Sequence, residues 1–223
     1  MSTRVLIVDD ETMTLRNLAA IVSEDPSLHV VATAQNGVDA LQQIRDQRPH
    51  VVIMDLYLPG EFDGVEAIRR IQNLLAPPVV VAATSFDLES YTRGALDAGA
   101  VGFILKNDAE TLLTPAIHAA AAGDPIVSPQ TTSRLIKNFL QPSTGPEIAR
   151  ARERIASLSD RELQVATMIG NGKVYKQIAA ELHIAPDTVK STVMKAMHKI
   201  GADNGAQLAF RVGQARLDID QQQ

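Results

Sequence analysis

Five short apolar runs, separated by amphipathic stretches of about 12 residues, constrain the fold of the first half of this chain. The runs are Val5 to Val8, Leu28 to Ala34, Val51 to Met54, Val79 to Ala83 and Val101 to Leu105. They are nearly continuous in Val, Ile, Leu and Ala, which is typical of strands buried on both faces of a parallel sheet. Strands that alternate with helices form right-handed βαβ units. We therefore expect an α/β domain with a five-stranded, doubly wound parallel sheet.

Proline-rich sequence separates this half of the chain from the rest. Within residues 124–154, the run from Gln141 to Pro146 is typical of a linker. An amphipathic piece from Leu135 to Leu140 predicts a short helix in the same segment. We expect a first domain at residues 1–123, a linker at 124–154, a second domain at 155–217 and a disordered tail at 218–223.

The helical pattern that ends the first domain, from Asp108 to Ala122, contains a proline at position 115. A proline inside a helix has no N–H to donate, and its ring crowds the preceding turn. We expect the helix to kink or to restart at Pro115.

The last third of the chain shows only helical patterns and predicts a small four-helix domain. Ser159 and Glu162 have the spacing of a capping box at the start of a helix. A short helix from Tyr175 to Leu182, a third that begins at Pro186 and a fourth from about Asp203 to Leu217 follow.

The second and third of these helices are short and joined by a tight turn, which is typical of a helix-turn-helix. Apolar residues at helical spacing predict the buried side of the third helix: Val189, Val193, Ala196 and Ile200. Its opposite side holds polar and basic residues together with one methionine: Lys190, Ser191, Met194, Lys195 and His198. In a helix-turn-helix this side enters the major groove of DNA, and an ordinary solvated helix is the alternative.

The net charge of −5 is divided unevenly along the chain. Residues 1–130 hold 8 basic and 17 acidic side chains, whereas residues 131–223 hold 13 and 9. An acidic first half suits a cation site and a basic second half suits phosphates, although a solvated surface explains either imbalance equally simply.

Composition also excludes several classes of protein. The chain has no Cys, so disulfide scaffolds, thiolate metal sites and a Cys nucleophile are excluded. The apolar runs are much shorter than a membrane span, and the N-terminus has no secretory signal, so we expect a cytoplasmic protein that does not bind membranes. The histidines show no spacing that suggests a metal site: His29, His50, His118, His183 and His198.

Polar side chains that suit phosphoryl chemistry follow the first, third, fourth and fifth apolar runs. Asp9 and Asp10 follow the first run, Asp55 the third, Thr84 the fourth and Lys106 the fifth. Because ligands bind at the carboxyl ends of strands in doubly wound sheets, we expect these side chains to gather into one site. Three carboxylates repel one another unless a cation neutralises them, and Mg²⁺ prefers oxygen ligands. An Asp beside Mg²⁺, a Lys and a hydroxyl suits phosphoryl transfer, with one carboxylate as the nucleophile.

Four motifs resemble the receiver domain of two-component response regulators: Val8-Asp9-Asp10, Met54 to Gly60, Ala82 to Ser85 and Gly102 to Lys106. The resemblance implies a flavodoxin-like sheet with strand order 2-1-3-4-5. It also implies that Asp55 accepts phosphate from a phosphohistidine on a sensor histidine kinase. The family's metal site would use Asp10 directly, Asp9 through water, Asp55 and the backbone carbonyl of Tyr57. Lys106 and Thr84 would bind the phosphoryl group, and Thr84 and Phe103 would be the switch residues.

Two features near the phosphoacceptor differ from the family pattern. The acidic-Gly pair Asp63-Gly64 comes one residue late, which lengthens the loop through Glu61 and Phe62. Tyr57 and Phe86 are bulky, and we expect them to shield the acyl phosphate from water.

The second half resembles the LuxR-type DNA-binding domain, which makes the whole chain similar to NarL/FixJ-class regulators. The resemblance rests on Leu158 to Glu162, Gly172, Ile178-Ala179, Leu182, Ile184, Thr188 to Lys190 and Lys199 to Gly201. We expect the DNA contacts to come from Lys173, Lys176, Thr188, Lys190, Ser191, Met194 and Lys195. The chain departs from the family at Val174, Tyr175, Ala185, Thr192 and Gly205, and Ala185 gives up a helix cap that contributes ~1 kcal/mol.

Three functions compete. The leading hypothesis is a phosphorylation-switched transcriptional regulator, not an enzyme, that forms a homodimer on activation and binds paired half-sites in promoter DNA. A phosphohydrolase that uses Asp55 is the second, although enzymes of the haloacid dehalogenase type need an Asp where Tyr57 stands. The third is a signalling adaptor or RNA-binding output whose helical domain has lost DNA binding.

Overall fold

The computed structural model describes residues 2–85, 94–124, 126, 154–209 and 211–212. The chain forms two compact units, Met1–Gly123 and Asp124–Gln223. Among the described residues, no helix combines the length and the apolarity needed to cross a bilayer. Phe86, the expected linker helix at 135–140 and the tail at 218–223 lie outside the described residues.

The first unit is built on a five-stranded sheet in which every neighbouring pair is parallel. Its strands are β1 (Thr3–Val8), β2 (Leu28–Ala34), β3 (Val51–Asp55), β4 (Val79–Thr84) and β5 (Gly102–Leu105). The strand order is β2-β1-β3-β4-β5, which confirms the flavodoxin-like arrangement. All residues of β3 are buried, as expected for a central strand covered on both faces.

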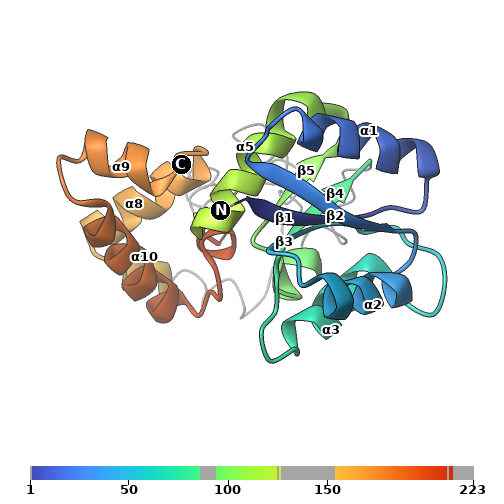
Figure 1. Ribbon diagram of the computed structural model, residues 1–223. Helices are drawn as coiled ribbons and strands as arrows, with labels where there is room; N and C mark the ends of the chain where they lie inside the picture. Colours follow the sequence, from blue (N-terminus) through green and yellow to red (C-terminus); the bar gives the residue numbers. More distant parts are fainter. Residues whose placement is uncertain (1, 86–93, 125, 127–153, 210, 213–223) are drawn as a thin grey trace. The chain divides into compact units, whose positions relative to one another are not determined.

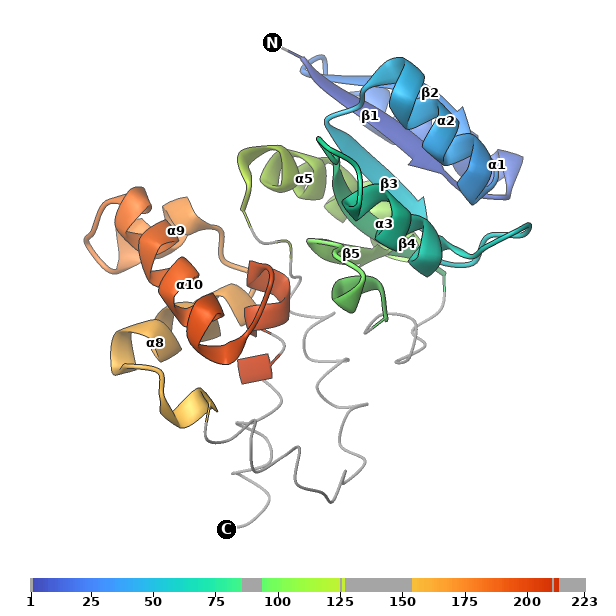
Figure 2. The same cartoon turned by 90° about the horizontal axis from the view of Figure 1, so that it is seen from below.

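Helices cover both faces of this sheet. They are α1 (Thr12–Ser23), α2 (Gly37–Gln47), α3 (Gly64–Gln72) and α5 (Ala109–Ala122). In Figure 1, α1 and α5 lie above the sheet and α2 and α3 lie below it, and Figure 2 shows the α2 and α3 side nearest the viewer. The arrangement is a three-layer α/β fold with its core on both faces of β1 and β3.

The helix does not restart at Pro115, because α5 runs as one helix from Ala109 to Ala122 with Pro115 inside it. A short 3₁₀ turn, η1 (Lys106–Asp108), precedes the helix. The apolar side of α5 explains this continuity, since Leu113, Ala116 and Ile117 are buried on either side of the proline. Tertiary packing of this kind outweighs the loss of one helical hydrogen bond.

Gly64, the first residue of α3, lies very close to the backbone at the end of β3. A Cβ at this position would overlap the backbone carbonyl oxygen of Asp55 and lie 2.7 Å from the Cα of Leu56. The Gly64 amide donates a hydrogen bond to the Leu56 carbonyl at 3.1 Å. Asp63 caps the helix by accepting a hydrogen bond from the Glu66 amide. The start of α3 is therefore packed directly on the backbone that carries Asp55.

The second unit contains the expected helix-turn-helix. Its helices are α8 (Asp160–Gly170), α9 (Tyr175–Glu181) and α10 (Pro186–Ile200), and residues 205–209 and 211–212 are also helical. The capping box of Ser159 and Glu162 is present at the start of α8. The predicted stripe of α10 is buried, with Val189, Val193, Ala196 and Ile200 each 1% exposed or less.

Ala185 is the N-cap of α10 and provides no side-chain cap, as expected from its residue type. Pro186 follows at the first position of the helix, where its missing N–H costs nothing. The fixed backbone of Pro186 therefore supports the start of α10 in place of a capping side chain.

Substituting Gly64→Ala should destabilise the first unit by about 1–3 kcal/mol, because the added carbon must displace the backbone of Asp55. The measurement is the free energy of unfolding in urea. Gly94→Ala is the matched control, since a Cβ at Gly94 would meet Val65 at an ordinary 3.5 Å. Equal effects of the two substitutions would contradict the close approach.

Candidate functional site

The expected carboxylates gather at the carboxyl ends of β1 and β3, which are neighbouring strands. Asp9 and Asp55 are 0% and 3% exposed, whereas Asp10 is exposed. One carboxylate oxygen from each of these three residues lies within 4.8 Å of the others. The structure therefore brings together the acidic residues that were predicted to form a cation site.

Backbone amides hold the two buried carboxylates in place. The Glu11 amide donates a hydrogen bond to Oδ1 of Asp9, and the Tyr57 amide donates one to Oδ1 of Asp55, each at 3.1 Å. In both residues the other oxygen, Oδ2, is then available to the shared site. The register of β1 on β3, which pairs Val8 with Met54, places the two residues side by side.

Lys106 joins the two buried carboxylates from the end of β5. Its Nζ lies 2.7 Å from Oδ2 of Asp55 and 2.5 Å from Oδ2 of Asp9. Burial acts to lower the pKa of Lys106, but the hydrogen bonds and charges of Asp55 and Asp9 outweigh it and raise that pKa. Burial raises the pKa of Asp55 above its usual value, against the opposing effect of Lys106. The Lys106 ammonium is therefore held charged, whereas burial disfavours the ionised form of Asp55.

The charges of this site fit a divalent cation. Three carboxylates face one ammonium, so the cluster keeps negative charge after Lys106 has paired with Asp9 and Asp55. A group of carboxylate oxygens is the donor set that Mg²⁺ uses, with several waters retained. The acidic cluster is therefore compatible with Mg²⁺.

The remaining predicted residues occupy the neighbouring strands. Thr84, 5% exposed, ends β4 and is paired with Leu105, the residue before Lys106. Phe103 is 4% exposed in β5 and is paired with Ala82. Tyr57 is 65% exposed, so its side chain is not buried with the two carboxylates.

One residue that supports this edge of the sheet was not among the predicted site residues. Gln35 follows β2, and its side-chain amide donates to the Asp10 carbonyl and to the Thr12 hydroxyl, each at 3.1 Å. It therefore ties the loop that carries Asp10 to the end of the neighbouring strand. A signal was present in the sequence, because Gln35 is the polar residue that follows the second apolar run.

The second unit exposes most of the residues predicted to contact DNA. On α10, Thr188, Lys190, Ser191, Met194 and Lys195 are exposed, and Met194 is 59% exposed although it is apolar. Lys176 on α9 is also exposed. Lys173 differs from the others, because its ammonium forms an ion pair with Glu181 at the end of α9.

Comparisons with known proteins agree with this geometry. Residues 5–118 match the family described as response regulator receiver domain, and residues 156–212 match that described as bacterial regulatory proteins, luxR family. The oxygen regulatory protein NreC of Staphylococcus epidermidis is 30% identical over 92% of this chain and 94% of its own length. The transcriptional regulatory protein LiaR of Bacillus subtilis shows the same identity and coverage.

A solved structure supports the fold of both units. The response regulator ChrA of a heme-sensing two-component system is 29% identical, with a TM-score of 0.54, over 97% of this chain and 98% of that one. The match covers both halves of the chain, as the two family matches do. The chain therefore belongs to the two-component response regulators of the NarL/FixJ class, with a receiver domain followed by a LuxR-type DNA-binding domain.

Proposed function

We propose that Asp55 is the phosphoacceptor of this regulator and that Asp9, Asp10, Asp55 and the Tyr57 carbonyl hold Mg²⁺ beside it. The observation that carries the proposal is the contact of Lys106 Nζ with Oδ2 of Asp55 at 2.7 Å and with Asp9 at 2.5 Å. A phosphoryl group on Asp55 would meet the same ammonium. Bound Mg²⁺ would supply neutralisation of the phosphoryl oxygens.

The chemistry starts from a phosphohistidine on the sensor kinase. A carboxylate oxygen of Asp55 attacks phosphorus, the P–N bond breaks, and its electron pair stays on the imidazole nitrogen of the donor. The Tyr57 amide orients the Asp55 carboxylate through its bond to Oδ1. Lys106 then pairs with the phosphoryl oxygens, and the Thr84 hydroxyl donates to one of them, which biases the surface around Phe103.

The output is a change in the assembly of the helical units on DNA. One small unit makes few phosphate contacts, so two copies are needed to bind with useful affinity. Phosphorylation, which adds about −1.5 to −2 charges, would favour a homodimer whose two units read paired half-sites in promoter DNA. Lys173, Lys176, Thr188, Lys190, Ser191, Met194 and Lys195 would make the contacts, and the protein would act in the cytoplasm.

The two other functions have less support. A phosphohydrolase would need an acid two residues after Asp55, and the Tyr57 side chain at that position is exposed. Turnover of small phosphate esters with Mg²⁺ would be the result that favours it. An adaptor output would leave the exposed basic side of α10 without a role, whereas an RNA-binding output would use it on the phosphates of RNA. Failure to bind duplex DNA would favour one of these two functions.

The first prediction concerns the acceptor. Asp55→Asn should abolish phosphorylation by acetyl phosphate in the presence of Mg²⁺, because an amide cannot act as the nucleophile. Phosphate-affinity electrophoresis of the full chain gives the measurement. Asp46→Asn removes an exposed carboxylate on α2 and should leave labelling unchanged. Labelling of Asp55→Asn at the wild-type level would assign the acceptor elsewhere.

The second prediction concerns stability without metal. Because burial raises the pKa of Asp55 above 3.8, ionisation of this group opposes folding. The neutral form of Asp55 therefore favours folding at low pH. This contribution to stability is lost as the pH rises from 3.8, the pKa of the unfolded state, through the raised pKa of the folded state. At pH 7 in a chelator, Asp55→Asn should therefore unfold at a higher temperature than wild type, because the amide has no charge to bury.

Mg²⁺ should reverse this order. The wild-type protein should gain about 2.7 kcal/mol at a Mg²⁺ concentration 100 times the dissociation constant, and Asp55→Asn should gain less. Thermal unfolding of both proteins with Mg²⁺ and with chelator provides the measurement. An Asp55→Asn variant that is less stable than wild type in chelator would overturn the account of the buried charge.

The third prediction concerns DNA. Lys190→Ala should weaken binding to duplex DNA and reduce the slope of log affinity against log salt by ~1, because one phosphate contact is lost. Fluorescence anisotropy with a random-sequence duplex at several salt concentrations measures both quantities. Arg45→Ala on α2 makes the same change of charge in the other unit and should alter neither. If Lys190→Ala behaved like the control, α10 would not face the phosphates.

A further inference from the structure

The loop between β3 and α3 is the part of the receiver domain in which this chain departs from its family by one residue. It runs from Leu56 to Asp63. Leu56 and Leu58 are 1% and 7% exposed, so the first part of the loop is anchored in the core on both sides of Tyr57. Pro59, Gly60 and Glu61 are exposed. A second anchor is needed after them if the longer loop is to keep one position.

Phe62 provides that anchor by packing on the start of α2. Its side chain is buried, at 9% exposed, although it lies in a surface loop. The ring fills the space that a side chain at Gly37 would occupy: a Cβ there would overlap Cε2 of Phe62 and lie 2.8 Å from Cδ2. Gly37 does not have a left-handed backbone. A glycine is therefore needed at this position to make room for the ring, and not to allow an unusual backbone conformation.

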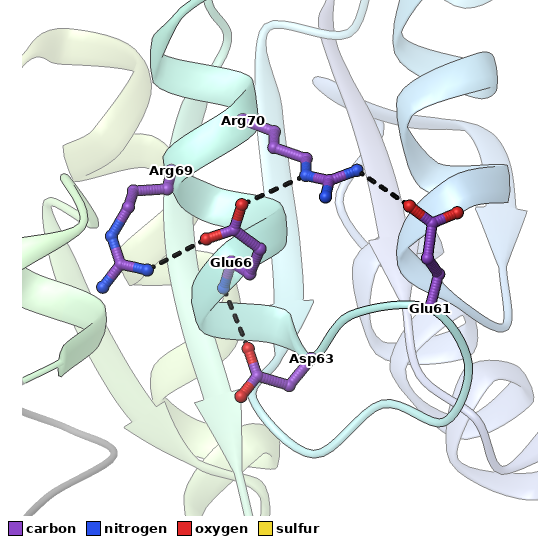
Figure 3. A network of polar contacts seen from close by, with 5 residues as sticks. All are labelled: Glu61, Asp63, Glu66, Arg69 and Arg70. Carbon is purple, nitrogen blue, oxygen red and sulfur yellow. Dashed lines mark hydrogen bonds and ion pairs between the residues drawn. The ribbon is translucent and has the colours of Figure 1, made fainter.

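Arg70 covers the ring from α3. The guanidinium carbon lies 3.9 Å from the centroid of the Phe62 ring, within the range of a cation–π contact. Arg70 Nε donates to Glu66 at 3.1 Å, and Nη1 reaches Glu61 at 3.4 Å, as Figure 3 shows. The hydrogen bonds from Arg70 and Arg69 also lower the pKa of Glu66, so that carboxylate stays ionised.

We name this arrangement the Phe62 clamp, which consists of Gly37, Phe62, Arg70, Glu61 and Glu66. It joins the loop to α2 on one side and to α3 on the other. The start of α3 is itself fixed against the backbone of Asp55 and Leu56 through Gly64. The segment from Asp55 to Gly64 is therefore held at both ends and at Phe62. An aromatic ring gives such a fixed point because it has few rotatable bonds to immobilise.

We propose that Phe62 is a positioning residue for the metal site, holding the lengthened loop so that the Tyr57 carbonyl and Asp55 are presented together to Mg²⁺. The inference rests on the proposed function, since it assumes that this carbonyl is a ligand. It follows from preorganisation: a loop that is fixed before binding loses less conformational freedom when the ion binds.

The experiment measures the Mg²⁺ dissociation constant of the full chain by calorimetry. Phe62→Ala should weaken Mg²⁺ binding by ~10-fold, the lower end of what supporting residues contribute at metal sites. Gly37→Ala should weaken it similarly, since its methyl group must push the ring out. The double variant should be no weaker than Phe62→Ala alone, because the methyl group then enters the vacated space. Leu75→Ala, at a fully exposed position, is the control.

A kinetic readout separates positioning from damage to the fold. With acetyl phosphate, Phe62→Ala should raise the Mg²⁺ concentration for half-maximal phosphorylation and leave the maximal rate unchanged. Partial unfolding would lower the maximal rate instead. Phe62→Leu keeps an apolar side chain at this position and should restore most of the affinity. If Phe62→Ala did not fold, Arg70→Gln would test the clamp from the surface, with a smaller loss of Mg²⁺ affinity expected.

The outcomes are distinct. The positioning role alone would be overturned if the wild-type chain bound Mg²⁺ and Phe62→Ala had the same dissociation constant. If Phe62→Ala did not fold, the same comparison would be made with Arg70→Gln. Additive losses in the double variant would also overturn it, because they would place Gly37 and Phe62 in separate effects. No Mg²⁺ binding by the wild-type chain would overturn both this inference and the proposed metal site.

Discussion

The burial of like charges at the ends of β1 and β3 is the constraint on which the receiver domain depends. Asp9 and Asp55 lie beneath the surface, and both would repel each other strongly without Lys106. The parallel sheet makes this arrangement possible, since it brings the carboxyl ends of distant segments to one edge and leaves backbone amides free to hold each carboxylate. Bringing these carboxylates together costs electrostatic free energy, which a bound cation would lower.

The sheet and the acidic site were predictable because both depend on patterns of adjacent residues. Near-continuous apolar runs specify buried parallel strands, and the residue after each run must then lie at the same edge. The stripe of α10 was predictable for a similar reason, since Val189 and its neighbours recur at the helical period. Local pattern and global fold agree in these segments, as expected for a sequence with one stable structure.

Other features depend on which segments meet in space, and the sequence carries no local signal for them. Phe62 looked like part of a longer loop, and its pairing with Gly37 becomes visible only when α2 lies beside α3. Pro115 was expected to kink or restart a helix, and the helix does not restart there because buried residues on both sides of the proline hold α5 together. Lys173 was predicted to contact phosphates, and the structure adds an ion pair between its ammonium and Glu181 at the end of α9. Each of these features depends on contacts between residues that are not neighbours in the sequence.

The backbone amide of Gly64 can report whether α3 stays in contact with the end of β3. The Gly64 amide is bonded to the Leu56 carbonyl, and residue 64 has no side chain that could shift independently. Exchange of this one amide hydrogen with solvent therefore requires α3 to lift away from the strand that carries Asp55. Comparing its exchange rate with those of amides in β3 would distinguish a local opening of the junction from unfolding of the whole domain.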